Sequence, residues 1–193
     1  MKVCFINPPF KSEYGKFSRE SRSPAIGHSG VLYYPLWLIY AAALVEKNGF
    51  EICFIDAPAK QMSKETCLSK IKKEAADAKL FVLDTSTPSI NSDLNFAEAL
   101  KAEIPNAYIV LVGTHPTATV EETLSNGIAA DAIARKEYDY TILELAEALN
   151  NNIPLNSVMG LSYKGKNKII NNPDREPLQN LDEIPLAAEI IKK

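Results

Sequence analysis

The sequence is short of cysteine, of long apolar runs and of any excess of charge, and each shortage excludes a class of protein. Three cysteines, Cys4, Cys53 and Cys67, lie far apart, so we expect neither a disulfide framework nor a zinc site of closely spaced ligands. No apolar stretch reaches the roughly 20 residues that cross a bilayer, so we expect no membrane span. The 21 basic and 24 acidic residues nearly balance, which gives no basic surface for nucleic acid. These absences favour a cytoplasmic globular protein.

Motifs for several common chemistries are also missing. No GxGxxG follows the first expected strand and no GxxxxGKS/T occurs, so sites for a dinucleotide or a nucleoside triphosphate are unsupported. The two histidines, His28 and His115, are not accompanied by an evident nucleophile–base pair, which a small hydrolase or transferase would need. A phosphorelay receiver is excluded at its metal site, because Asn7, Pro8 and Pro9 follow the first strand in place of an acidic cluster. We assign no role to His28.

What the sequence does contain is a regular alternation of two patterns through residues 1–150. Apolar, β-branched runs without polar alternation predict buried strands at residues 2–6, 50–55, 80–83, 109–112 and 130–134. Amphipathic stretches between them predict helices at residues 34–47, 63–76, 90–103, 117–125 and 139–149. Ser63 and Thr117 are the expected N-caps of two of these helices. Strands that alternate with helices predict a parallel sheet with right-handed crossovers. We therefore predict a flavodoxin-like, doubly wound α/β fold with five parallel strands in the order 2-1-3-4-5.

The pattern changes after residue 150. Two short apolar segments, 158–163 and 168–170, flank a turn that contains glycine and predict a β-hairpin. Residues 171–193 contain three prolines and a linker-like LDEIP, so we expect them to pack poorly or to pack against a neighbouring molecule. We therefore divide the chain into a Rossmann-type domain, residues 1–150, and a hairpin with a linker, residues 151–193. The long polar segment 10–33 is expected to be functional or mobile.

Three of the expected strands end in short, polar, proline-containing segments. These are Asn7-Pro8-Pro9, Thr85-Ser86-Thr87-Pro88 and Gly113-Thr114-His115-Pro116. In the predicted strand order they meet where the order reverses, which is where open α/β sheets bind ligands. Gly113 would allow a sharp turn or the close approach of another group. The same segments would also suit ordinary turns and helix caps, with Ser89 and Thr117 as caps, and the sequence leaves that alternative open.

Several segments, taken in order, resemble a known family. They are INPPF at 6–10, YYPLWLIYAAALVEKNGFEICFIDA at 33–57, DTSTPS at 84–89, VGTHPTATVEETL at 112–124, ARKEYDYTILEL at 134–145, GLSYKGKNKIINNP at 160–173 and LDEIP at 181–185. Together they resemble the N-terminal cobalamin-binding domain of cobalamin-dependent radical S-adenosylmethionine enzymes. Each segment alone is weakly specific, whereas their order and spacing are more so.

The resemblance implies that the ligand is cobalamin. The residues expected to contact it are Asn7, Pro8, Tyr33, Trp37, Thr85, Ser86, Thr87, Gly113, Thr114 and His115. The rings of Tyr33 and Trp37 would cover the flat macrocycle, although core packing of a helix is an equal alternative for Trp37. Other corrinoid domains carry Asp-x-His-x-x-Gly after the first strand, a pattern absent here. We therefore expect no protein ligand to cobalt, and His115 is expected to form loop hydrogen bonds.

The resemblance also implies a larger parent enzyme. Such enzymes contain a radical S-adenosylmethionine domain that binds a 4Fe–4S cluster through CxxxCxxC, and this spacing is absent here. We therefore expect a C-terminal radical S-adenosylmethionine domain in cis, outside this chain, that performs methyl transfer or related radical chemistry. The alternative function is a ligand-free flavodoxin-like scaffold that docks a partner domain.

Overall fold

The computed structural model describes residues 1–10, 16–19, 25–27, 32–186 and 190. Its centre is a seven-stranded sheet in the order β4-β1-β5-β6-β7-β8-β9. The bounds of these strands are β1 (Lys2–Asn7), β4 (Glu51–Asp56), β5 (Leu80–Asp84), β6 (Tyr108–Val112), β7 (Ala132–Ala134), β8 (Leu161–Lys164) and β9 (Ile169–Asn171).

The first five strands of this sheet are parallel, in the order predicted from the sequence. β1 pairs with β4 on one side and with β5 on the other, and β6 and β7 follow in the same direction. The predicted order 2-1-3-4-5 is therefore confirmed. It places the reversal of strand order between β1 and β5.

The predicted C-terminal hairpin is also confirmed, and it extends the main sheet. β8 runs antiparallel to β7, with Ala134 opposite Leu161, and β9 runs antiparallel to β8. The sequence analysis did not predict this pairing with β7. The short, buried β7 has a free edge in a five-stranded sheet, and β8 covers that edge.

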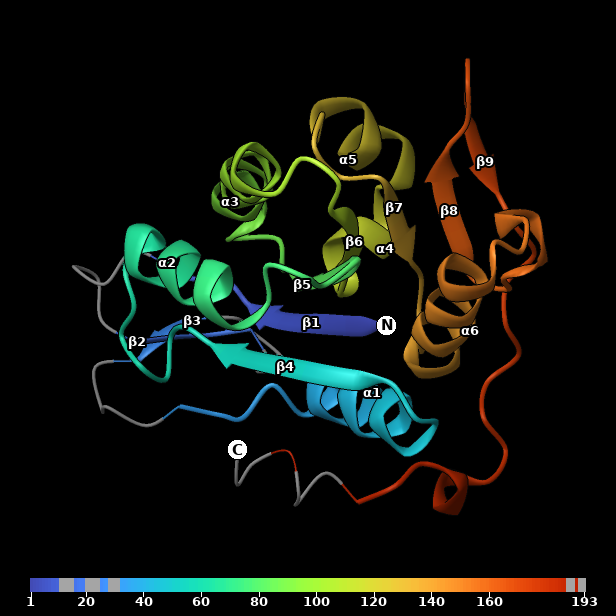
Figure 1. Ribbon diagram of the computed structural model, residues 1–193, viewed down its shortest axis with the longest axis horizontal. Coiled ribbons are helices and arrows are strands. Elements are labelled where there is room, and N and C mark those ends of the chain that lie inside the picture. Colours follow the sequence, from blue (N-terminus) through green and yellow to red (C-terminus); the bar gives the residue numbers. More distant parts are fainter. Residues whose placement is uncertain (11–15, 20–24, 28–31, 187–189, 191–193) are drawn as a thin grey trace.

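Helices cover both faces of the sheet, as Figure 1 shows. One face carries α1 (Leu36–Lys47) and α6 (Asp139–Asn151), which pack on Val3 and Phe5 of β1. The opposite face buries Cys4 and Ile6 of the same strand. It is covered by α2 (Lys64–Glu74), α3 (Ile90–Glu103) and α5 (Val120–Asn126). Successive side chains of a strand point to opposite faces, so a continuous apolar run fills both cores.

The helix predicted from Thr117 to residue 125 is two short helices, and Thr117 is not its N-cap. The first, α4 (Thr114–Ala118), begins directly after Gly113, and α5 follows after Thr119. The hydroxyls of Thr117 and Thr119 donate to the carbonyls four residues earlier, at 2.8 and 2.9 Å. Such bonds to the backbone compete with the regular helical pattern, which accounts for the break at Thr119. By contrast, Ser63 caps α2 as predicted and accepts a hydrogen bond from the Thr66 N–H.

The connection from β1 to α1 contains two short strands that the sequence analysis treated as irregular. They are β2 (Lys16–Ser18) and β3 (Ala25–Gly27), paired antiparallel. Phe17 is buried and stacks on Phe10, with ring centroids 4.2 Å apart. His28, to which no role was assigned, lies outside the described residues.

Asn172, at the start of the tail, is an exception to the prediction that residues 171–193 pack poorly, whereas Pro173 and Asp174 are exposed. Asn172 is buried, and its side-chain amide donates to the carbonyls of Leu155 and Val158, each at 2.7 Å. Leu155 belongs to the short 3-10 helix η2 (Leu155–Ser157), and a second one, η3 (Leu181–Glu183), lies further along the tail. The prediction missed Asn172 because it counted apolar residues, whereas hydrogen bonds hold this side chain.

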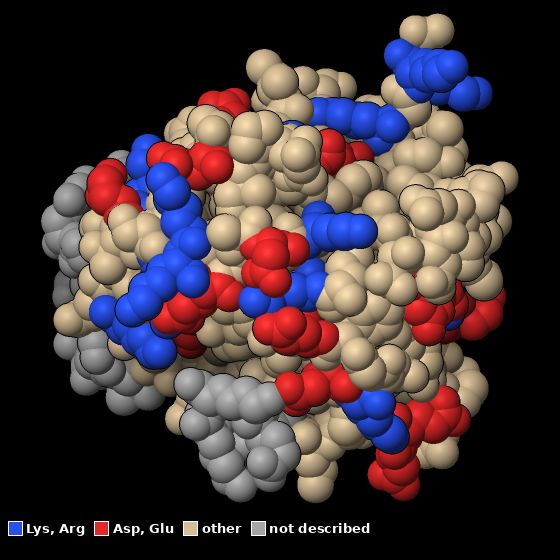
Figure 2. All heavy atoms as spheres, in the orientation of Figure 1, with Lys and Arg blue, Asp and Glu red and all other residues tan. Residues whose placement is uncertain are grey.

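The surface carries charged side chains of both signs, as the nearly equal numbers of basic and acidic residues suggested. Figure 2 shows acidic and basic side chains next to one another over much of the face that it draws. Within the described residues, none of the helices combines the length and the apolar character needed to cross a membrane.

Candidate functional site

The ends of β1, β5 and β6 lie side by side at the carboxyl edge of the sheet, as the sequence predicted. They bring Asn7, Thr85 and Gly113 to one edge, at the point where the strand order reverses. The N–H of Thr85 donates to the carbonyl of Val112 at 3.0 Å, so β5 and β6 stay paired to their last residues. This edge is the candidate site.

Gly113 brings the end of β6 very close to the end of β5. A Cβ atom on Gly113 would lie 2.1 Å from the carbonyl oxygen of Thr85 and 3.4 Å from Oδ1 of Asp84. The φ angle of Gly113 is 116°, a conformation that residues with a side chain rarely adopt. Both the sharp turn and the close approach suggested by the sequence therefore occur here, and both require glycine.

The small polar residues of the site divide into a buried and an exposed group. Thr85 and Ser86 are buried, whereas Thr87 and Thr114 are exposed and His115 is half-buried. Nδ1 of His115 lies 3.3 Å from Oγ1 of Thr87, so the histidine links the segment after β6 to the segment after β5. The exposed residues form the rim of the site, and the buried ones form its floor.

Beneath this edge lies a buried polar network that the sequence did not predict. Arg19 donates through Nη2 to Oδ1 of Asp93 at 2.5 Å, and through Nη1 to Oδ1 of Asn7 at 2.6 Å and the carbonyl of Pro8 at 2.9 Å. Asp93 also accepts from the hydroxyl of Ser89 at 2.6 Å. The Arg19 and Asp93 side chains are 1% and 0% exposed. This ion pair therefore fixes the segment after β1 against the first turn of α3.

Sequence reasoning missed Arg19 and Asp93 for identifiable reasons. The two residues are 74 positions apart, and Arg19 lies in a polar segment without a periodic pattern. Asp93 reads as an ordinary acid in the first turn of a helix. The spacing Ser89-x-x-x-Asp93, one helical turn, was the available signal that the two side chains meet.

Asp84, the last residue of β5, is buried without full hydrogen bonding. It is 4% exposed, and its Oδ2 has no hydrogen-bond partner among the described residues. Burial raises the pKa of Asp84 to about 7, the positive charge of Arg19 opposes this rise, and the negative charge of Asp93 adds to it. The carboxyl group is therefore part protonated near neutral pH and has an oxygen free to bond.

The aromatic residues predicted to contact the ligand are not joined to this edge by the described contacts. Tyr33 is 65% exposed and Trp37, in the first turn of α1, is 62% exposed. Trp37 lines a cavity of about 910 Å³ between α1, α6 and the tail, and none of the strand-end residues is among its described lining. The structure thus brings eight of the ten predicted residues to this edge, and the described contacts do not connect Tyr33 and Trp37 to them.

Within the described part of the chain, no three His, Cys, Asp or Glu side chains lie in an arrangement that could hold a metal ion. The ends of the strands therefore offer backbone groups, hydroxyls, one imidazole and one buried carboxyl for binding a neutral or polar ligand.

Comparison with known sequences gives a family and several relatives. Residues 22–146 match the B12 binding domain family. The chain is 30% identical over 188 residues to the uncharacterized methyltransferase PH0819 of Pyrococcus horikoshii, a match that covers 97% of this chain and 38% of that protein. It is 25% identical to an anaerobic magnesium-protoporphyrin IX monomethyl ester cyclase of Rubrivivax gelatinosus, covering 95% of this chain and 32% of the relative. The chain thus spans about a third of the length of these curated relatives.

Solved structures of two enzymes share the fold. The radical S-adenosylmethionine methyltransferase TsrM from Kitasatospora setae, with cobalamin and a 4Fe–4S cluster bound, matches with a TM-score of 0.71 and 14% identity. That match covers 95% of this chain and 30% of TsrM. The cobalamin-dependent S-adenosylmethionine radical enzyme OxsB, with aqua-cobalamin and S-adenosylmethionine bound, matches with a TM-score of 0.74 and 14% identity, covering 95% of this chain and 23% of OxsB. The family match covers more than half of the sequence, and this chain therefore belongs to the B12-binding domain family.

Proposed function

We propose that this B12-binding domain holds cobalamin over the ends of β1, β5 and β6 and serves a radical S-adenosylmethionine enzyme. The observation that carries the proposal is the convergence of three polar strand ends at the reversal of strand order. Open α/β sheets bind their ligands at this point. The reaction proposed for the parent enzyme is methyl transfer or related radical chemistry.

The residues at this edge fit a large, polar ligand such as cobalamin. The side chains of Thr87, Thr114 and His115 are at the surface and can bond to the amides of a corrin or to its nucleotide tail. Oδ2 of Asp84 is a buried polar atom without a partner among the described residues, which leaves a bonding position for a ligand group. Gly113 lets the ends of β5 and β6 approach each other, because the Thr85 carbonyl fills the position that a Cβ would take.

The roles of the individual residues follow from their burial. Asn7, Pro8, Thr85 and Ser86 are buried, so we assign them to the floor that shapes the site. When bound, cobalamin supplies a cobalt ion that can carry a transferable group. We propose that no side chain of this domain ligates that cobalt, because the Asp-x-His-x-x-Gly pattern that follows the first strand in other corrinoid domains is absent. Tyr33 and Trp37 remain predicted to cover the macrocycle.

We also propose that the radical S-adenosylmethionine domain, with its 4Fe–4S cluster, lies in the same polypeptide. The supporting fact is that this chain matches 38% and 32% of the length of two relatives. Residues 151–193 would then link the two domains, through the hairpin and the tail. A CxxxCxxC motif encoded downstream of Lys193 would support this arrangement, and a stop codon there would contradict it. We also propose a cytoplasmic location, because the thiols of Cys4, Cys53 and Cys67 are free.

Titration with hydroxocobalamin, followed by visible absorbance, tests the placement of the ligand. The chain should show a saturable spectral change. Thr114→Phe should abolish it, because a ring added at the rim would occupy the space above the edge. Glu98→Phe is the matched control, since Glu98 is exposed on α3. Binding by Thr114→Phe equal to that of the unaltered chain would place cobalamin elsewhere, and no binding by the unaltered chain would refute the function.

Electron paramagnetic resonance of the bound Co(II) form tests the absence of a protein ligand. A nitrogen bonded below the cobalt splits the signal, and we expect no such splitting from this protein. Splitting that disappears in His115→Ala would show that His115 ligates the cobalt.

A further inference from the structure

The cavity beside Trp37 is formed by the tail and by the first turns of two helices. Residues 175–186 run past α6 and then beneath α1, as Figure 1 shows, and enclose about 910 Å³ against them. A cavity of this volume is in the range that holds small molecules. Two hydrogen bonds hold the tail in place. The N–H of Leu178 donates to Oε2 of Glu137, and the hydroxyl of Tyr140 donates to Oε2 of Glu183.

Three aromatic side chains line this cavity: Trp37 and Tyr40 from α1, and Tyr140 from α6. The face of an aromatic ring carries partial negative charge and attracts a cation within about 6 Å of its centre. The structure already shows one such contact, because the guanidinium carbon of Arg175 lies 5.9 Å from the centre of the Tyr140 ring.

The charged residues that line the cavity are mostly acidic. Arg175 is the single basic residue among the described lining, and it forms an ion pair with Glu144. The acidic residues of the described lining are Glu137, Asp139, Glu176, Asp182 and Glu183. The described lining therefore carries an excess of negative charge, which is unfavourable in a partly enclosed space without a compensating cation.

Asp139 is an acidic residue of this lining whose carboxyl group is incompletely hydrogen-bonded within the described residues. It is 9% exposed, it lines the cavity, and its Oδ1 has no hydrogen-bond partner among the described residues. Burial raises the pKa of Asp139 to about 6, and the neighbouring charge of Glu137 adds to the rise. The start of α6 explains an acid at this position, because helix N-termini favour negative charge. It does not explain a buried oxygen that is left without a partner.

We propose that this cavity binds a small organic cation with an ammonium or sulfonium group, held between the aromatic rings and the carboxylate of Asp139. The positive charge would favour the ionised carboxylate of Asp139 and offset the excess negative charge of the described lining. The rings of Trp37, Tyr40 and Tyr140 would contact its alkyl substituents and its positive charge. The site shares Trp37 with the residues proposed to contact cobalamin but uses none of the strand-end residues, so it is tested in the chain without cobalamin.

Choline is a suitable probe because a neutral molecule of the same shape exists, 3,3-dimethylbutan-1-ol. Trp37 is the single tryptophan of the sequence, so its fluorescence reports directly on the cavity. We expect choline chloride to change this fluorescence in a saturable way, in the intact chain without cobalamin, with sodium chloride keeping the ionic strength constant. The neutral analogue should cause no saturable change. Equal responses to both molecules, or no response to choline, would overturn the proposal.

Variants separate the role of Asp139 from a general effect of charge. Asp139→Asn keeps the shape of the side chain and should weaken choline binding about tenfold, as expected for the loss of one charged contact. Glu98→Gln removes one negative charge from the opposite face of the sheet and should leave the affinity unchanged. If Asp139→Asn is not folded by circular dichroism, Glu183→Gln takes its place and should also weaken binding. Undiminished affinity in the folded variant would overturn the proposal.

Discussion

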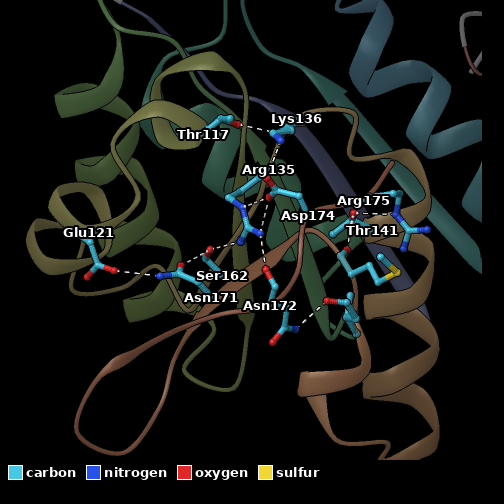
Figure 3. A network of polar contacts seen from close by, with 12 residues as sticks. Thr117, Glu121, Arg135, Lys136, Thr141, Ser162, Asn171, Asn172, Asp174 and Arg175 are labelled. Atoms are coloured by element: carbon cyan, nitrogen blue, oxygen red, sulfur yellow. Dashed lines mark hydrogen bonds and ion pairs between the residues drawn. The ribbon is translucent and has the colours of Figure 1, made fainter. Parts of the chain in front are cut away.

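Arg135 and Asp174 join the end of β7 to the start of the tail across 39 positions of sequence. Nε and Nη2 of Arg135 lie 3.1 and 2.8 Å from Oδ1 of Asp174, so one carboxylate oxygen accepts two bonds from the guanidinium. Figure 3 shows that Arg135 also reaches Ser162 of β8 and Asn172 of the tail, where Nη2 donates to the Asn172 carbonyl at 2.6 Å. A single arginine thus connects the parallel sheet, the hairpin and the tail.

Replacing Arg135 should loosen the tail more than it loosens the sheet. Arg135→Gln leaves the Asn172 carbonyl and Ser162 hydroxyl without their partner, at a cost of roughly 1–3 kcal/mol in the free energy of unfolding. Hydrogen exchange should speed up in residues 171–178, with smaller changes in β1 and β5. Lys136→Gln is the control, because Lys136 also pairs with Asp174 but at the surface, where such pairs contribute little. Equal effects of the two variants would show that Arg135 is not the connecting residue.

Gly113 should tolerate alanine far less well than Gly49 does. Both have positive φ angles, 116° and 86°, but an added Cβ would meet the Thr85 carbonyl at 2.1 Å in the first case and nothing within 4 Å in the second. Gly49→Ala should therefore cost about 1–2 kcal/mol from backbone strain alone. Gly113→Ala should cost clearly more in urea unfolding, because the β5–β6 junction must also move apart. Equal costs would mean that the close approach to Thr85 is not tight.

The expected destabilisation by Gly113 variants also affects how cobalamin-binding tests at this position are interpreted. A larger residue at position 113 would displace the backbone, because its Cβ would meet the Thr85 carbonyl. Loss of cobalamin binding in a Gly113 variant is therefore informative only where the fold is intact. For this reason Thr114→Phe, at an exposed position, is the sharper test.

The parallel sheet and its order could be predicted because each strand is an uninterrupted apolar run between clear stop signals. Asn7-Pro8-Pro9 and Gly113 mark strand ends by local chemistry, which a sequence displays directly. The contact between Arg19 and Asp93 could not be predicted, since it depends on how the segment after β1 folds back over the sheet. The same holds for β8, whose pairing with β7 leaves no periodic signal that differs from any other hairpin.

The candidate site was also predicted from the sequence only in part. The sequence identified which segments meet, because strand order brings them together. It did not show that Thr85 and Ser86 are buried and Thr87 is exposed, because a turn has no fixed period from which burial can be read. Nor did it show that Trp37 lies against the tail, since the tail reaches α1 through tertiary contacts.

Asp84 should make the stability of the fold depend on pH. Its pKa is about 7 in the folded protein, against an ordinary value of 3.8, so the folded state retains this proton while the unfolded state releases it. Stability is therefore lost as the pH rises from about 4 to about 7. Asp84→Asn should change stability little at pH 4 and should raise it at pH 8, by roughly 1–3 kcal/mol. Urea unfolding at both pH values measures the difference.

Asp77 provides a control of the opposite sign. A hydrogen bond from Lys2 lowers the pKa of Asp77 on the surface, so its charged form favours the folded state. Asp77→Asn should therefore lower stability slightly at pH 8 and leave it unchanged at low pH. A similar loss of stability at pH 8 in Asp84→Asn would show that the Asp84 carboxylate is stabilised in the fold, contrary to our assignment.

The affinity of the tail cavity for choline should fall as Asp139 becomes protonated. The pKa of Asp139 is about 6, raised first by burial and then by the charge of Glu137. Above this pH the carboxylate is ionised and attracts the cation, and below it the neutral acid does not, so choline binding should weaken between pH 7 and pH 5. The other ionisable groups that line the cavity are Tyr140, Arg175, Glu176, Asp182 and Glu183.

Trp37 fluorescence titrations at several pH values measure this dependence, and Asp139→Asn supplies the reference. In that variant the weaker affinity that remains should change less over the same range, because the carboxyl group at position 139 is gone. Bound choline should in turn lower the pKa of Asp139, since a cation favours the ionised form of its partner. An affinity that is independent of pH in the unaltered chain would mean that the cation does not contact Asp139. A pH dependence that persists in Asp139→Asn would assign it to another of these groups.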